Sequence, residues 1–230
     1  MEAVSLLPNG NYGVMGKILK TKQNMKIAFT GSSGSGKTTL VTYVAEQLKL
    51  QHISGSAGDV KKEGDKMLID DMLAYPGGGH VGVIRYSALN PEYGVMNQKL
   101  LQMRRRELIM ENDNFVTDRS PIDNLTYFIN QCGYHPLVTN QMVEEFAKDC
   151  LKAWEELTHV IYVKAVQPNA VEVNGSRVAN NWYQKAIDAQ FEYWLLNFFI
   201  KESLAGPEVL VIDYWDLDQR KEEVLRFLNS

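Results

Sequence analysis

One short stretch of the sequence has residue types and a spacing that suit phosphate chemistry. Gly31 to Thr38 spell GSSGSGKT and match the pattern G-x-x-x-x-G-K-[ST], with an apolar run before them and a helix-like run after them. Glycines permit a backbone curvature that turns successive N–H groups toward one anion, and a helix beginning at the loop adds its positive end. The stretch is therefore expected to hold the phosphates of a nucleoside triphosphate.

Two side chains of this loop have separate tasks in such chemistry. Lys37 is expected to reach the β- and γ-phosphates, and Thr38 to present its hydroxyl to Mg²⁺. The residues expected to contact ATP are Gly31, Ser33, Gly34, Ser35, Gly36, Lys37, Thr38 and Thr39.

A second candidate group follows a later apolar run. The run at 115–117 ends in Asp118 and Arg119, at the start of the stretch DRSPIDNLTY. Hydrolysing ATPases usually follow the strand-end aspartate with a glutamate that activates water, and this chain has arginine there. The sequence also lacks the N-K-x-D motif of regulatory GTPases and the L-S-G-G-Q motif of ABC proteins. These absences favour transfer of the phosphoryl group to a bound acceptor over transfer to water.

Strands and helices that must position these residues are expected to alternate along the chain. Apolar runs predict strands at 26–30, 52–53, 115–117, 159–164 and 209–212. Amphipathic runs predict helices at 39–50, 65–75, 96–111, 122–130, 141–157, 180–202 and 219–228, and glycines predict an irregular segment at 77–94. Such alternation is typical of a parallel sheet with helices on both faces, which binds ligands at the carboxyl ends of its strands.

Composition narrows the class of protein further. A chain of 230 residues suits one α/β domain with a small lid, and its net charge of −4 argues against non-specific binding to nucleic acid. No apolar run approaches the ~20 residues of a membrane span, and the N-terminus lacks the basic start and apolar core of a secretion signal. We therefore expect a cytoplasmic protein without a membrane partner, in which Cys132 and Cys150 stay reduced.

Taken in their order along the chain, the motifs resemble those of P-loop nucleoside and nucleotide kinases. The resemblance rests on GSSGSGKTT, on DRS at 118–120 and on NGSR at 174–177. Thymidylate kinases have D-R-[YH] at the place of DRS, and deoxynucleoside kinases have E-R-S. The fuller set of Gln98, Glu107 and FVTDRSPIDNLTY is similar to phage and bacterial ATP-dependent kinases.

The resemblance covers residues 25–230 and implies a three-layer P-loop NTPase fold. A parallel five-stranded sheet would have helices on both faces and a small lid segment at about 165–180. Residues 1–24 would form an N-terminal extension, to which we assign no role.

The resemblance also implies roles for single residues. Asp118 would orient Mg²⁺, and Arg119 would bind the acceptor or the phosphoryl group in flight. Arg177 would close from the lid onto the ATP phosphates, and Gln98 would bind a base edge or a ribose. Asp59 would accept or orient a proton of the acceptor, although the E-P or E-x-W pattern of nucleoside kinases is absent there. The choice between a nucleoside and a nucleotide acceptor therefore stays open.

The helical run at 96–111 contains an arginine cluster and regularly spaced methionines. Arg104, Arg105 and Arg106 cannot all face one site on a helix, so one of them, for which we take Arg104, is expected to bind an acceptor phosphate. The methionines are expected to be packing residues and not ligands of a cofactor; they are Met96, Met103 and Met110.

The expected activity is Mg²⁺-dependent transfer of the γ-phosphoryl group of ATP to a nucleotide-type acceptor. A deoxynucleoside monophosphate is the first choice, and a deoxynucleoside is its variant. A kinase that acts on a hydroxymethylated base in DNA is an alternative, which Arg85 and the basic run at 104–106 keep open. A nucleotide-binding regulator with little turnover is the third class. The oligomeric state stays open, with a homodimer as one option.

Overall fold

The computed structural model describes residues 24–55, 86, 89–165 and 181–230 of the chain. The N-terminal extension, the helix expected at 65–75 and most of the expected lid lie outside these ranges. Of the expected irregular segment at 77–94, residues 77–85, 87 and 88 lie outside these ranges as well.

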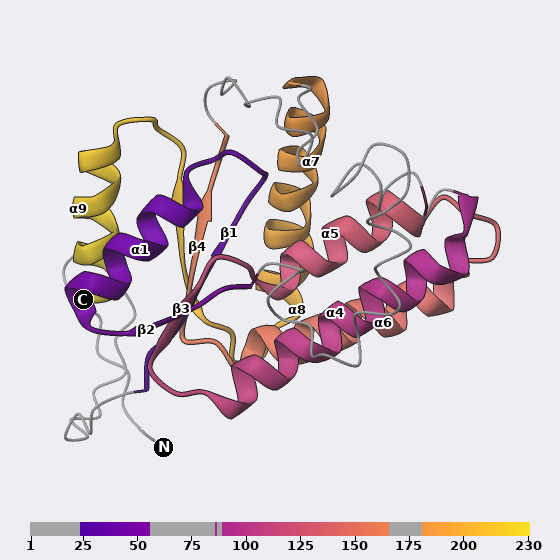
Figure 1. Cartoon of the computed structure of the whole chain (residues 1–230), viewed down its shortest axis with the longest axis horizontal. Coiled ribbons are helices and arrows are strands. Elements are labelled where there is room, and N and C mark those ends of the chain that lie inside the picture. The colour runs from indigo at the N-terminus through magenta and orange to yellow at the C-terminus, as the bar shows by residue number, and fades with distance from the viewer. Residues whose placement is uncertain (1–23, 56–85, 87–88, 166–180) are drawn as a thin grey trace, which may run out of the picture.

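Five parallel strands form one sheet in the middle of the molecule (Figure 1). The strands are β1 (Lys26–Thr30), β2 (Gln51–Ile53), β3 (Phe115–Thr117), β4 (His159–Val163) and β5 (Glu208–Ile212). Their spatial order is β2-β3-β1-β4-β5. The central strand β1 pairs Ala28 with Thr117 of β3 and Thr30 with Tyr162 of β4. The segments that follow these three strands therefore begin at the same edge of the sheet, as the sequence predicts.

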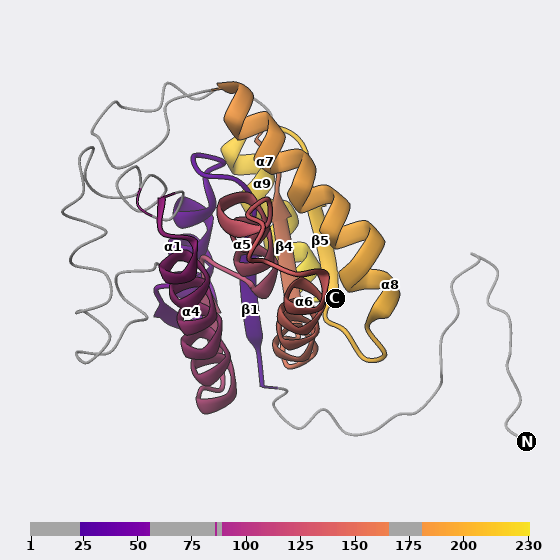
Figure 2. The same ribbon diagram turned by 90° about the vertical axis from the view of Figure 1, so that its right-hand side faces the viewer.

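Helices cover both faces of the sheet and complete three layers (Figures 1 and 2). The helical segments are α1 (Lys37–Leu48), α4 (Pro91–Glu111), α5 (Pro121–Cys132), α6 (Asn140–Glu155), α7 (Asn181–Trp194), the π-helical η2 (Leu195–Phe199), α8 (Ile200–Glu202) and α9 (Leu217–Leu228). Helices α1 and α9 pack together on one face, while α4 to α7 lie on the other. None of the described helices combines the length and the apolar character that a membrane span requires.

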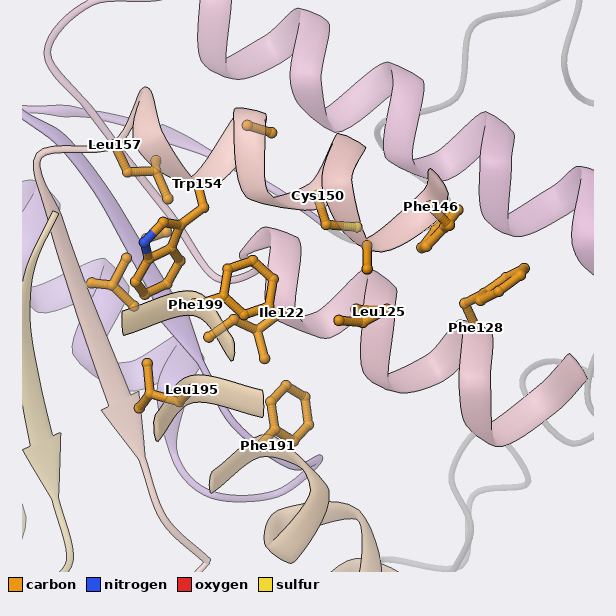
Figure 3. Close-up of a cluster of buried hydrophobic side chains, with 14 of the residues drawn as sticks. Ile122, Leu125, Phe128, Phe146, Cys150, Trp154, Leu157, Phe191, Leu195 and Phe199 are labelled. Atoms are coloured by element: carbon orange, nitrogen blue, oxygen red, sulfur yellow. The ribbon is translucent and has the colours of Figure 1, made fainter. Parts of the chain in front are cut away.

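The sheet separates two apolar clusters. Ile27 and Phe29 of β1 pack with α1 and α9, whereas Ala28 between them faces the larger cluster. Figure 3 shows that α5, α6 and the end of the α7–η2 segment supply the side chains of this larger cluster. In it, the rings of Phe128 and Phe146 stack with 4.3 Å between centroids. Burying each such side chain contributes ~1.5–3 kcal/mol, which holds these helices against the sheet.

Helix α4 differs from its sequence-based prediction at its start and on its exposed side. The expected irregular segment ends at Gly94, but the helix already begins at Pro91, where the missing N–H of proline has no helical partner to lose. The methionines at 96, 103 and 110 are 49%, 45% and 55% exposed, so the prediction that they are packing residues is wrong. The buried side of α4 includes Gln98, Gln102 and Arg105, and this polar character misleads a prediction from apolar spacing.

Candidate active site

The loop between β1 and α1 follows a path that requires its glycines. Gly31 has φ 132°, and a Cβ atom on it would lie 2.3 Å from the carbonyl oxygen of Val163 in β4. Gly34 and Gly36 have φ of 82° and 94°, in the left-handed region that other residues seldom adopt. Helix α1 begins at Lys37, directly after the last of these turns. The loop therefore has the positive-φ glycines and the helix N-terminus of a phosphate-binding site.

The side-chain amine of Lys37 is buried and held by neutral oxygen atoms. Its Nζ donates to the carbonyl oxygens of Gly31 at 2.8 Å and Ser32 at 2.7 Å, and to Oγ of Ser35 at 3.3 Å. No carboxylate of the described residues forms an ion pair with it. Burial lowers the pKa of the Lys37 ammonium to about 7, because desolvation disfavours the charge. An anion at this loop would supply the missing opposite charge.

The end of β3 packs closely against Gly55, which lies two residues after the end of β2. The N–H of Gly55 donates to Oδ1 of Asp118 at 2.9 Å, and its carbonyl oxygen accepts from Nη2 and Nε of Arg105 at 2.8 and 3.1 Å. A Cβ atom on Gly55 would lie 2.5 Å from Cβ of Arg119 and 2.8 Å from Oγ1 of Thr117. One glycine therefore connects the strand-end aspartate to the arginine of α4.

Arg119 is held in place by a buried carboxylate. Its Nη1 donates to Oδ1 of Asp123 at 2.9 Å, while Oδ2 of Asp123 accepts from Oγ1 of Thr30 at 2.8 Å and from the N–H of Ser120. Burial opposes the charge of Arg119, but the contact with Asp123 outweighs it and raises the pKa of the guanidinium above its usual range. Asp123 also completes the capping box of α5 that begins with Ser120. The same carboxylate thus ties the arginine to the end of β1.

The phosphate loop and the end of β3 belong to one cluster of charges. The charge of Arg119 lowers the pKa of Lys37 further, and the charges of Asp123 and Asp118 oppose that shift. Arg105 experiences the same three charges, and burial lowers its pKa to about 10. The structure therefore brings the predicted residues Lys37, Asp118 and Arg119 together, and it adds Arg105 and Asp123, which the sequence did not assign to the site.

The three arginines of α4 have different surroundings. Arg105 is buried and contacts Gly55, whereas Arg104 pairs with Glu107 at 2.8 Å and Arg106 pairs with Asp149 at 2.9 Å. Position 105 is thus the one that α4 presents to the charge cluster, although Arg104 was our candidate. Successive helical positions point about 100° apart, and the spacing of apolar residues in this helix does not indicate which of the three arginines faces the sheet. The acceptor role of Arg104 stays a prediction.

Carboxamide side chains fill part of the interface between α4 and α5. Nε2 of Gln98 donates to Oε1 of Gln131 at 2.8 Å, and Nδ2 of Asn124 donates to Oε1 of Gln102. All four residues are buried, and Oδ1 of Asn124 has no hydrogen-bond partner among the described residues. Of this group the sequence singled out only Gln98. Amides that interrupt the apolar positions of a helix were the available signal for the other three.

The donor atoms near the loop suit the expected cofactors. Thr38 is exposed on the first turn of α1, and Asp118 is half-buried at the end of β3. Hydroxyl and carboxylate oxygens are ligands that Mg²⁺ accepts, together with substrate phosphates and water. Asp59 and Arg177 lie outside the described residues, so their roles stay predictions. The other predicted ATP contacts lie on the loop or the first turn of α1: Ser33, Gly34, Ser35, Gly36 and Thr39.

Three solved structures share the architecture of this chain. The YorR protein from Bacillus subtilis, in complex with phosphorylated GDP, is 17% identical with a TM-score of 0.51 over 88% of this chain and 95% of that one. Deoxyadenosine kinase from M. mycoides with bound dCTP is 15% identical, with a TM-score of 0.59 over 89% and 99%. Thymidylate kinase from Candida albicans is 12% identical, with a TM-score of 0.59 over 90% and 92%. A search of the curated proteins found no match.

These similarities and the loop define the class of the protein by its fold. It is an α/β P-loop protein with the architecture of nucleoside and nucleotide kinases, which confirms the fold predicted from the motifs. A family model described as an AAA domain matches residues 26–195, and the chain belongs to this family.

Proposed function

We propose that the protein transfers the γ-phosphoryl group of ATP to a nucleotide-type acceptor, with Mg²⁺ as cofactor. One observation carries the proposal: among the described residues the buried Nζ of Lys37 donates hydrogen bonds only to neutral oxygens, and it lies in one charge cluster with Arg119 and Arg105. Such a cluster suits two anionic reactants brought together, because transfer between them depends on positioning and on neutralised charge.

Each residue of the cluster has a distinct task in the transfer. Lys37 binds the β- and γ-phosphates, and Arg119 stabilises the charge on the phosphoryl group in flight. Thr38 and Asp118 hold Mg²⁺, which when bound neutralises part of the charge on the β- and γ-phosphates. An acceptor oxygen forms a bond to the γ-phosphorus as the bond to the β–γ bridging oxygen breaks, and ADP leaves with the electron pair. A hydroxyl acceptor would also need a base, the role proposed for Asp59.

The acceptor side supports a deoxynucleoside monophosphate. Arg105 supplies a buried cation suited to an acceptor phosphate, and the carboxamide of Gln98 supplies a donor and an acceptor suited to a base edge. The similarity in fold to a thymidylate kinase agrees with a nucleotide, and the similarity to a deoxyadenosine kinase favours a deoxynucleoside as the second candidate.

A homodimer and a cytoplasmic location complete the proposal. The exposed side of α4 has a line of large apolar side chains, and such surfaces mark contacts with other proteins. The apolar side chains of this line are Tyr93, Met96, Met103 and Met110. Covering this line with the same line of a second copy would remove it from water.

A panel of acceptors with γ-labelled ATP tests the proposed function. Deoxynucleoside monophosphates, deoxynucleosides and oligonucleotides are each incubated with the protein, and the label is located in the products. Label in deoxynucleoside diphosphates supports the first choice, and label only in oligonucleotides would overturn it. Lys37→Ala should abolish transfer without unfolding the protein, while Arg106→Gln, at an exposed ion pair with Asp149, should leave transfer unchanged.

A further inference from the structure

Two helices far along the chain send buried side chains to the outer side of the phosphate loop. Gln184 of α7 is 8% exposed, and its Nε2 donates to the carbonyl oxygen of Ser33 at 2.7 Å. Arg220 of α9 is 2% exposed, and its Nη1 donates to the carbonyl oxygen of Ser35 at 2.8 Å. Figure 1 shows α7 and α9 on either side of the sheet edge at which the loop lies. The loop therefore accepts hydrogen bonds from α7 on one side and from α9 on the other.

Each contact fixes the orientation of one peptide group. In a planar trans peptide the C=O and the following N–H point in opposite directions. A carbonyl of Ser33 held outward by Gln184 therefore sets the direction of the N–H of Gly34, and a carbonyl of Ser35 held by Arg220 sets that of Gly36. Both glycines belong to the group expected to contact ATP. Since glycine peptides rotate with little steric restraint, the loop itself does not enforce these directions.

The side chain of Arg220 is itself held by contacts with its surroundings, so it can restrict the movement of the loop. Its Nε donates to the carbonyl oxygen of Tyr214, and its guanidinium carbon lies 5.4 Å from the centroid of the Trp215 ring. A Cβ atom on Gly36 would lie 3.3 Å from Nη1 of Arg220, so the guanidinium packs directly on the loop. Its Nη2 is buried with no hydrogen-bond partner among the described residues. The side chain therefore bridges the end of β5 and the phosphate loop.

We propose that Gln184 and Arg220 are positioning residues that hold the amides of the phosphate loop ready for a triphosphate. This inference rests on the proposed binding of ATP at the loop. Neither residue needs to touch the nucleotide, because each acts through a carbonyl of the loop. The benefit is preorganisation: without the two contacts, the loop must order its peptide groups when the phosphates bind.

Calorimetric binding of ATP and of inorganic tripolyphosphate to the full chain tests the inference. Gln184→Met and Arg220→Met remove the donors and keep much of the side-chain volume. Each should weaken the binding of both probes by about tenfold, the ratio that corresponds to one lost hydrogen bond of a charged or buried donor. Tripolyphosphate has no base or sugar, so an equal loss for both probes assigns the effect to the phosphate loop.

Matched controls come from exposed positions on the same helices. Lys185→Met in α7 and Arg226→Met in α9 alter charge and surface without reaching the loop, and they should bind both probes as the wild type does. Thermal unfolding of each nucleotide-free variant identifies any variant that fails to fold. If a methionine variant does not fold, Gln184→Asn or Arg220→Lys takes its place. Asn is too short to reach the carbonyl oxygen of Ser33, and Lys has a single nitrogen in place of the two with which Arg220 contacts Ser35 and Tyr214.

The outcomes separate this inference from the proposed function. Folded variants that bind tripolyphosphate like the wild type would overturn the positioning role while ATP binding by the wild type still supports the function. Loss of ATP binding with unchanged tripolyphosphate binding would also overturn it, since the residues would then recognise the nucleoside. A wild-type protein that binds neither probe would overturn both proposals.

Discussion

Among single residues, Lys37 is proposed to bind phosphates as a cation, yet its buried site disfavours the positive charge. Burial lowers its pKa to about 7, so at pH 8 most molecules of the free protein hold a neutral lysine. A bound triphosphate favours the protonated form, because opposite charges attract strongly where water is excluded. Binding of ATP should therefore be coupled to uptake of a proton.

Calorimetry at pH 8 in buffers of different ionisation enthalpy measures this coupling. The wild type should take up close to one proton as ATP binds, and the uptake should decline as the pH falls toward 6, where Lys37 already holds its proton. Lys37→Arg keeps a permanent positive charge and should show almost no uptake. Equal uptake by the two proteins at pH 8 would show that the proton goes elsewhere.

Asp123 should act on the rate through Arg119 more than on the affinity for ATP. Asp123→Asn removes the charge that holds the guanidinium, so kcat should fall by roughly 10- to 100-fold through lost orientation, which is a larger change than that in the dissociation constant of ATP. Loss of this buried ion pair and of the capping box should also lower the free energy of unfolding by about 3 kcal/mol. Steady-state kinetics and urea unfolding measure the two effects separately.

A variant in another helix separates stability from catalysis. Thr139 caps α6 through the N–H of Met142, away from the charge cluster. Thr139→Ala should lower the free energy of unfolding by ~1 kcal/mol and leave kcat unchanged. If Asp123→Asn loses stability but keeps its kcat, then Asp123 is only a helix cap.

At the scale of elements, the contact between the ends of β2 and β3 depends on Gly55. Gly55→Ala places a Cβ atom 2.5 Å from Cβ of Arg119, an atom too close to the backbone to move aside. The variant should lose ~1–3 kcal/mol of unfolding free energy, as overpacked sites do, and its transfer rate should fall because Asp118 and Arg119 are displaced. Denaturant unfolding and kinetics on the folded protein check both expectations.

Gly133→Ala is the matched control for this substitution. Its Cβ atom would lie 2.7 Å from the carbonyl oxygen of Ile129 at the end of α5, so it should destabilise the protein comparably. It lies at the far end of α5 from Arg119, and transfer by the folded variant should stay normal. Equal loss of transfer in the two variants would mean that the rate follows stability and not the geometry of the site.

The elements were predictable where local pattern decides the structure. The five predicted strands agree with the observed ones within a residue or two. Three of them, β1, β3 and β4, are buried, and buried parallel strands are apolar on both faces. The start of α4 was mispredicted because Gly94 suggested a loop, yet the helix tolerates it. The 180–202 helix was predicted as continuous, and its π-helical turn at Leu195–Phe199 leaves no simple mark in the sequence.

The site was predictable as far as its motif extends along the chain. Asp118 follows β3 directly, and Lys37 begins α1 after the glycine loop that follows β1, so the positions of both follow from the topology. The remaining contacts join distant segments: Arg105 and Gly55 are 50 residues apart, and Arg220 and Ser35 are 185 apart. A single sequence does not specify which of three adjacent arginines turns inward, or which helix reaches the loop from outside.

At the scale of the whole molecule, the apolar line on α4 bears on assembly. Light scattering after size exclusion should give twice the 26.1 kDa mass of the chain. Replacing both Met96 and Met103 with lysine should shift the mass to that of one chain, because a buried like-charge pair opposes association. A monomeric wild type at micromolar concentration would contradict the homodimer.

The destination of the phosphoryl group distinguishes a kinase from a hydrolase, and labelled ATP reveals it. The wild type is mixed with γ-labelled ATP, Mg²⁺ and deoxynucleoside monophosphates, and the label in deoxynucleoside diphosphate is compared with the label in inorganic phosphate. We predict that most of the label enters the diphosphate and that Lys37→Ala transfers none. Label that appears only in inorganic phosphate, or a Lys37→Ala variant as active as the wild type, would contradict the account.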